Sequence, residues 1–321
     1  MTASSSSPSQ PTDLCTLCPR NCGVNRKEGK TGFCGSTSEI RIARAALHMW
    51  EEPCISGLEG SGTVFFTGCS LRCVYCQNNR ISGSFSAPGK KTAVGKAVTK
   101  EELSDIFLDL QAQGANNINL VTPDHFMPDI DTALDIAKEK GLLLPVVCNC
   151  SGYESVESLG KYYKNVDIFL TDFKYMDPGL AKRLSKAPDY PEVAKKALEK
   201  MLELAGGPVF LDKPSGSEDI NIMKKGVIVR HLVLPGHKKN SKEVIKYIAE
   251  NYGDRVFLSV MNQYTPPAYL SGMPEYADIA RKVTKREYTK VVDYCLCLGM
   301  ENVFIQEGET ASESFIPDFS C

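Results

Sequence analysis

The sequence feature that most constrains the fold is a three-cysteine loop directly after a short apolar run. Residues 63–66 are β-branched and aromatic, which predicts a buried strand, and Cys69, Cys73 and Cys76 follow with the spacing C-x3-C-x2-C. Three thiolates at this spacing can bind three corners of a cubane iron–sulfur cluster and leave the fourth iron without a protein ligand. In electron carriers, by contrast, protein ligands bind all four irons of the cluster. The alternatives are an ordinary zinc site or three packed core thiols.

The residues around these cysteines extend the pattern to Gly-Cys-x-x-Arg-Cys-x-Tyr-Cys-x-Asn, from Gly68 to Asn78. This stretch resembles the cluster loop of radical S-adenosylmethionine (SAM) enzymes, and more narrowly the branch of the pyruvate formate-lyase activating enzymes. The resemblance implies a [4Fe-4S] cluster whose open iron binds SAM, and an electron that splits SAM into methionine and a 5′-deoxyadenosyl radical. It also implies cofactor contacts for Tyr75 and Asn78, a reductant such as flavodoxin or ferredoxin, and a glycyl-radical enzyme or other protein as substrate.

A second cysteine group precedes the loop, with the spacing C-x2-C-x3-C-x11-C. Its members are Cys15, Cys18, Cys22 and Cys34. Four thiolates within twenty residues, threaded by glycines and a proline, suit a tetrahedral zinc or iron site, and the alternative is a small core of buried thiols. Together with residues 117–125 and 172–189, this stretch also resembles a less characterised subfamily of activating-enzyme-related proteins.

Length and composition predict one large α/β domain with a small appendage, in a chain of 321 residues with 42% hydrophobic and 24% charged residues. We expect a disordered tail over 1–12, a four-cysteine appendage over 13–38 and a barrel domain over 39–321. The net charge of −2 gives no basic field for nucleic acid. No apolar run approaches the roughly 20 residues that span a bilayer, and no signal peptide is evident, so we expect no membrane partner and a cytoplasmic location.

Strands and helices alternate along the chain with short links, which predicts a parallel sheet. Expected strands cover 63–66, 118–121, 144–148, 166–170, 226–234, 256–260 and 303–305, and one further strand lies within 40–47. Expected helices cover 99–114, 131–140, a short segment ending at 159, 190–204, 241–252 and 284–298. Periodicity alone does not separate an open sheet from a barrel. The radical SAM resemblance implies a partial (β/α)6 barrel, with the chemistry at the carboxyl ends of the strands.

The ends of the second and third strands of this barrel carry short polar side chains. The second strand ends in Thr122 and His125, where the broader family often has a Gly-Gly-Glu motif for the SAM amino group. That motif is absent, so Thr122 and nearby carbonyls are the candidate substitutes. His125 is a candidate proton carrier or partner contact, or else a structural loop residue. The third strand ends near Asn149 and Ser151, which suit ribose hydroxyls, or else form a strand-to-helix turn capped by Ser151.

The fourth strand ends in Asp172-x-Lys174-x-x-Asp177, which resembles a segment of glycyl-radical activating enzymes. This resemblance implies that Lys174 meets the SAM carboxylate and that Asp172 shapes the substrate side. The alternative is an exposed lysine at a strand end.

The fifth and sixth strands complete the predicted site. The segment from Arg230 to Gly236 is similar to the family's Arg-x-x-x-x-Pro-Gly, which implies that Arg230 or His231 faces the methionine part of SAM. At the sixth strand an activating enzyme presents a histidine to SAM, and Gln263 or Tyr264 occupies that place here.

Two further stretches are predicted to lie at the surface. Glu51 and Glu52 read as solvated loop charges, with an approach to the SAM or partner site as the alternative, and residues 82–97 read as a loop beside the active-site mouth. Three functions remain in competition: activation of a glycyl-radical enzyme, radical SAM chemistry on another protein side chain or small molecule, and a non-enzymatic iron–sulfur or metal-binding module.

Overall fold

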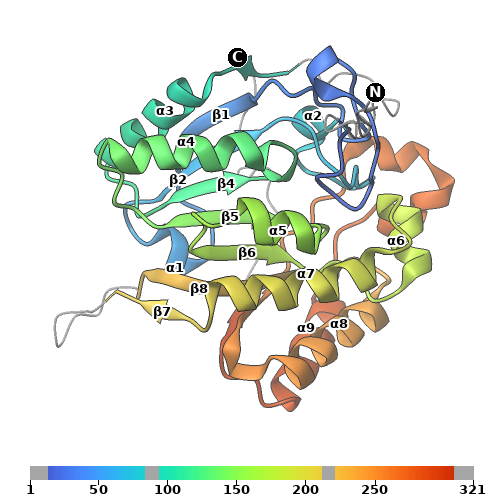
Figure 1. Ribbon diagram of the computed structural model, residues 1–321. Coiled ribbons are helices and arrows are strands. Elements are labelled where there is room, and N and C mark those ends of the chain that lie inside the picture. The colour runs from blue at the N-terminus through green and yellow to red at the C-terminus, as the bar shows by residue number, and fades with distance from the viewer. Residues whose placement is uncertain (1–13, 84–93, 212–220, 307–321) are drawn as a thin grey trace, which may run out of the picture.

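The fold centres on a curved sheet with the strand order β10-β9-β8-β6-β5-β4-β2-β1-β3, and β7 pairs with β8 (Figure 1). The computed structural model describes residues 14–83, 94–211 and 221–306. The predicted tail and most of the predicted loop at 82–97 lie outside these residues. The strands are β1 (Arg41–His48), β2 (Ser61–Phe66), β3 (Lys96–Ala97), β4 (Ile118–Val121), β5 (Val146–Cys150), β6 (Ile168–Asp172), β7 (Val209–Phe210), β8 (Met223–Leu232), β9 (Phe257–Met261) and β10 (Val303–Ile305).

The strands from β2 to β10 in this order pair in parallel, and β1 runs antiparallel to β2. Among the described residues the sheet does not close, because β10 and β3 are its two end strands. The predicted parallel α/β sheet and partial barrel are therefore confirmed. Parallel pairing brings the carboxyl ends of β2, β4, β5, β6, β8 and β9 to one edge, where the cluster loop begins.

Helices cover the outer face of the sheet (Figure 1). They are α1 (Pro53–Ser56), α2 (Asn79–Ser82), α3 (Lys100–Ala112), α4 (Met127–Glu139), α5 (Val156–Tyr162), α6 (Pro178–Ser185), α7 (Tyr190–Ala205), α8 (Lys238–Asn251) and α9 (Lys285–Cys297). A capping box begins α3, since the Thr99 hydroxyl accepts from the Glu102 N–H and the Glu102 carboxylate accepts from the Thr99 N–H. Among the described residues, no helix is both long enough and apolar enough to cross a membrane.

The two faces of the sheet carry different cores. On β5, Cys148 packs into the large core beneath the outer helices, whereas Val147 belongs to a smaller interior cluster with Ile168 and Ile228. Helix α1 contributes Cys54 and Ile55 to this interior cluster. The apolar cluster fills the interior near the amino ends of the strands and leaves room for polar side chains nearer their carboxyl ends.

The N-terminal segment packs directly on the cluster loop. The buried guanidinium of Arg26 donates to the carbonyl oxygens of Thr37 (3.1 Å from Nε) and His125 (2.5 Å from Nη1). The Ser36 hydroxyl donates to the carbonyl of Thr67 at 3.2 Å. The strand predicted within 40–47 is β1, which pairs with β2 and so joins the appendage to the sheet.

Candidate active site

A polar cavity of about 230 Å³ lies at the carboxyl edge of the sheet. Seven of the ten residues predicted to bind the cofactor line it, together with two of the three cluster-loop cysteines. These residues are Tyr75, Asn78, Asn149, Asp172, Lys174, Arg230, Gln263, Cys73 and Cys76. They come from the cluster loop and from the ends of β5, β6, β8 and β9, so the parallel topology is what gathers them.

The backbone of the cluster loop is held in a conformation that few residues can adopt. Gly68 has a φ of +94°, and a Cβ atom there would lie 2.3 Å from the Ser36 hydroxyl and 2.8 Å from the Cys34 carbonyl oxygen. Arg72 also has a positive φ, of 53°, and is fully buried. The Val74 N–H donates to the carbonyl of Leu184 at 2.8 Å, which ties the loop to α6. Gly68 is therefore required because the N-terminal segment lies against it.

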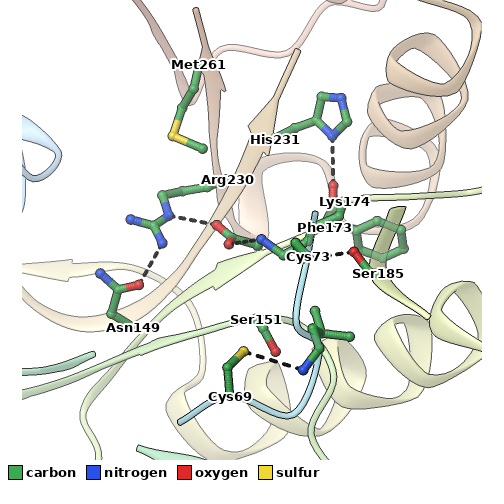
Figure 2. Close-up of polar contacts among 12 residues, drawn as sticks. Cys69, Cys73, Asn149, Ser151, Phe173, Lys174, Ser185, Arg230, His231 and Met261 are labelled. Atoms are coloured by element: carbon green, nitrogen blue, oxygen red, sulfur yellow. Dashed lines mark hydrogen bonds and ion pairs between the residues drawn. The ribbon is translucent and has the colours of Figure 1, made fainter. Parts of the chain in front are cut away.

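The three cysteine sulfurs of the loop have hydrogen-bond donors. The Ser185 hydroxyl donates to Cys73 Sγ at 2.9 Å, and the Leu71 N–H donates to Cys69 Sγ at 3.4 Å (Figure 2). Burial raises the pKa of all three thiols, to about 11 for Cys69. The same donors, and the Lys174 ammonium near Cys73 and Cys76, favour the thiolate form that iron binds. This donor set fits an iron–sulfur cluster.

A charged network crosses the cavity next to the cluster loop. Arg230 Nε donates to Asp172 at 3.0 Å, and its Nη2 donates to the Asn149 side-chain oxygen at 2.6 Å (Figure 2). Lys174 forms an ion pair with the other Asp172 oxygen. Burial alone would raise the pKa of Asp172, but Lys174 and Arg230 hold it below its usual value. Burial opposes the charge of Lys174, but Asp172 and Cys73 raise its pKa, so this ammonium stays charged.

Three predicted cofactor contacts lie outside the lining of this cavity. The His231 ring turns to the helical side of β8, where Nδ1 donates to the Phe173 carbonyl at 2.7 Å and burial lowers its pKa to about 4 (Figure 2). The Ser151 hydroxyl donates to Glu154 at 3.1 Å. Thr122 has a φ of 55°, and its N–H donates to the Asn149 carbonyl. Of the pair Arg230 and His231, the structure therefore places only Arg230 in the cavity.

His125 and Tyr264 have structural contacts. His125 Nε2 donates to the Thr67 carbonyl at 2.7 Å, and burial lowers its pKa to about 3, so the ring is neutral. The Tyr264 hydroxyl donates to the Ile279 carbonyl at 2.6 Å. Gln263 rather than Tyr264 therefore reaches the cavity.

Glu52 is buried and only 9% of the Glu51 side chain is exposed, so the prediction that they are solvated loop charges is wrong. The Glu51 carboxylate accepts from Asn119 at 3.1 Å, from Asn149 at 3.2 Å and from Arg230 at 3.3 Å. Glu52 is only 8% exposed. The segment that begins α1 turns into the sheet interior because Cys54 and Ile55 pack there. Those two apolar residues are the signal in the sequence that could have indicated burial.

The four N-terminal cysteines lie beside the cluster loop. The Cys69 N–H donates to the Cys34 carbonyl at 3.4 Å. Burial raises the pKa of Cys18 well above its usual value, and the charges of Cys34, Cys15 and Cys22 raise it further. Within the part of the chain that the structure describes, no three Cys, His, Asp or Glu side chains form a ready site for one metal ion. Metal binding by this group stays a prediction. A cubane is a different case, because each of its thiolates binds a different iron.

Arg20 strengthens the contact between the N-terminal segment and the cluster loop. Its guanidinium donates to the carbonyls of Ser70 (2.8 Å) and Ser185 (3.1 Å) and stacks over Phe33, 4.0 Å from the ring centroid. Arg72 of the cluster loop lies over the same ring at 5.1 Å. The N-terminal segment, the cluster loop and α6 are therefore joined through one arginine and one phenylalanine.

Comparison with known proteins gives the family. Residues 63–248, more than half of the chain, match the profile described as the Radical SAM superfamily. The chain belongs to the radical SAM superfamily. This membership implies an enzyme with a [4Fe-4S] cluster and SAM as its cofactors.

The chain is also similar to two curated relatives and to a solved structure. The chain is 30% identical over 285 residues to the uncharacterised protein MJ0674 of Methanocaldococcus jannaschii, covering 87% of this chain and 73% of the relative. It is 24% identical over 298 residues to MJ0808 of the same organism, covering 87% and 79%. SuiB of Streptococcus suis, bound to precursor peptide SuiA, is 19% identical with a TM-score of 0.46, covering 75% of this chain and 47% of SuiB. The chain thus spans about half the length of SuiB.

Proposed function

We propose that this radical SAM protein cleaves SAM reductively at a cluster held by Cys69, Cys73 and Cys76, and removes a hydrogen atom from a glycine of a partner protein. A [4Fe-4S] cluster held by these cysteines would supply one electron for cleavage of SAM into methionine and a 5′-deoxyadenosyl radical, and flavodoxin or ferredoxin is the proposed electron donor. The observation that supports cleavage is the set of three loop sulfurs, each facing hydrogen-bond donors, of which Cys73 and Cys76 line the polar cavity. The glycine rests on the sequence resemblance to activating enzymes.

The chain's own charged residues position SAM in this proposal. Lys174 acts electrostatically on both Cys73 and Cys76, so its ammonium suits a carboxylate bound next to the cluster. Asp172 and Glu51 provide acceptors in the same cavity, where a Gly-Gly-Glu motif is absent. Because Arg230 is bonded to both of these carboxylates, it fixes their orientation.

A second candidate function is hydrogen abstraction from another protein side chain or from a small molecule. The observation that favours it is a second cavity, of about 650 Å³, which adjoins the first. A glycine residue has no side chain to fill such a space.

The test is anaerobic turnover with SAM and a reductant, with 5′-deoxyadenosine as the product measured. Replacement of Cys69, Cys73 or Cys76 by alanine should remove the visible absorption of the cluster and abolish the product, whereas Cys297→Ala, at an exposed cysteine, should do neither. Product formed by any of the three loop variants would contradict the ligand assignment.

The glycine step needs its own test. A candidate glycyl-radical enzyme carrying Cα-deuterated glycine should transfer deuterium into 5′-deoxyadenosine and acquire a stable radical signal. If deoxyadenosine forms without deuterium while another substrate is modified, the second candidate function holds instead.

A further inference from the structure

The second cavity opens between β10 and the segment that follows β1. Its lining includes the exposed side chains of Met49 and Trp50 and the largely buried side chains of Glu51 and Glu52, so the outer part is apolar and the carboxylates lie deeper. Five residues line both this cavity and the one beside the cluster loop, so the two adjoin. They are Trp50, Glu51, Arg230, Met261 and Gln263.

Glu52 is the least compensated charge in this cavity. Its side chain is buried, its Oε2 atom has no hydrogen-bond partner, and it forms no ion pair with any described Lys, Arg or His. Ser259 hydrogen-bonds to it, and Arg230 acts on it only through space, since the Arg230 bonds go to Asp172, Glu51 and Asn149. A buried carboxylate without a charged partner is costly, which makes this arrangement unfavourable without a ligand.

Around Glu52, the described negative charges outnumber the positive charges, and hydrogen-bond acceptors are left without donors. Among the described residues, Glu51, Glu52 and Asp172 face two cations, Arg230 and Lys174. The side-chain oxygen of Asn119, which is bonded through its nitrogen to Glu51, also lacks a donor. Burial raises the pKa of Glu52 to about 6, with Arg230 opposing this effect, so the group is largely ionised at neutral pH. Arg230, whose hydrogen bonds go to Asp172, Glu51 and Asn149, is the one cation in the described lining of this cavity, so Glu52 lacks a positively charged hydrogen-bond donor there.

We infer that the second cavity binds a positively charged nitrogen group of the substrate, an ammonium or a guanidinium, against the Glu52 carboxylate. The apolar outer part suits the methylene stem of such a group, and the ring of Trp50, 62% exposed at the rim, offers a face to the cation. Neutral and acidic substrates are disfavoured, because they would leave Glu52 unpaired or add a like charge. The inference rests on the proposed function in assigning this cavity to the substrate.

The chain carries its own probe for this site, because Trp50 is its only tryptophan. Tryptophan emission of the anaerobic, cluster-loaded protein with SAM is titrated with n-butylamine, n-butylguanidine and the neutral control n-butanol. We expect saturable changes with the two cations at concentrations where butanol has no effect. Glu52→Gln, which keeps the shape and removes the charge, should weaken cation binding about ten-fold or more, the range for hydrogen bonds to charged groups.

The matched control is Glu59→Gln, an exposed carboxylate on the same segment and outside the cavity lining, which should leave binding unchanged. Equal responses to butanol and the amines in the unmutated protein would overturn the inference even if Glu52→Gln failed to fold. Equal cation affinities in a folded Glu52→Gln would also overturn it. The peptides Gly-Lys-Gly and Gly-Gln-Gly then separate the sources: preference for the lysine peptide over butylamine indicates a polypeptide substrate, and the reverse indicates a small amine.

No reductant is present in these titrations, so no SAM is cleaved. Binding of cations without any deoxyadenosine in turnover assays would therefore refute the proposed function and leave the cation site standing. Deoxyadenosine formation without cation binding would refute the cation site and leave SAM cleavage standing.

Discussion

Replacement of Lys174 by methionine tests the link between the charged network and SAM. Methionine keeps most of the apolar stem and removes the ammonium, which is paired with Asp172 and acts on Cys73 and Cys76. If the ammonium contacts the SAM carboxylate, its loss should cost about 1.5 to 3 kcal/mol of binding free energy. That corresponds to a roughly ten- to hundred-fold rise in the dissociation constant for SAM.

The variant should fold. Asp172 keeps its hydrogen bond from Arg230 at 3.0 Å, so it is not left as an unpaired buried charge. The loss of stability should therefore be smaller than the ~3–5 kcal/mol typical of a buried pair reduced to one partner. Cluster content should equal that of the unmutated protein, because Lys174 is not a ligand. The reduction potential of the cluster should fall, because a positive charge near two of its thiolates has gone.

The assay is equilibrium SAM binding to the anaerobically reconstituted proteins. Lys140→Met is the matched control, since Lys140 also pairs with an aspartate, Asp105 at 2.7 Å, but lies exposed and away from the cavity. It should bind SAM as the unmutated protein does. Equal SAM affinity of Lys174→Met and the unmutated protein, with clusters intact in both, would refute the reasoning and move the carboxylate contact to Arg230.

Three other perturbations give direct readouts. Ser185→Ala removes the hydroxyl that donates to Cys73 Sγ at 2.9 Å, so the cluster should persist with a lower reduction potential in a redox titration followed by EPR; an unchanged potential would contradict this. Replacing both Cys15 and Cys18 by alanine should lower bound zinc or iron and the melting temperature, and unchanged values of both would favour the buried-thiol alternative. The pKa of the Glu52 carboxyl group is raised to about 6 in the folded protein, against roughly 4.3 in the unfolded chain. Ionisation of Glu52 therefore destabilises the fold, so the protein has its full stability below pH 4 and loses part of it as the pH rises through 6. Glu52→Gln should therefore gain about 2 kcal/mol in urea unfolding at pH 8 and nothing at pH 4, and equal gains at both pH values would show that the charge is not responsible.

The sequence contains the local part of this architecture. The cysteine spacing and its flanking residues indicated the cluster loop, and the change between strand and helix periods indicated the parallel sheet. The helix expected to begin at Thr99 and the strand expected at 118–121 agree with the structure, where Thr99 is the N-cap residue of α3. These features follow from neighbouring residues along the chain, because caps, periods and ligand spacings act over a few positions.

The direction of side chains at the strand ends was decided only by the tertiary structure. Adjacent residues of a strand point to opposite faces, so the pattern states that Arg230 and His231 diverge but not which of them points inward. Outer helices cover the face that carries His231, and the interior keeps Arg230. The same limit applies to Glu51 and Glu52, whose burial depends on α1 entering the sheet interior.

Contacts between distant segments were likewise beyond the sequence pattern. Ser185 reaches Cys73 across 112 positions, and the N-terminal segment meets Gly68 across more than thirty. Such contacts arise when separate elements pack, and no local propensity encodes the partner. The sequence by itself therefore determined which residues form the three-cysteine loop and which elements form the sheet. Only packing decided which charges share the cavity, because the cost of burying each charge depends on neighbours brought from elsewhere in the chain.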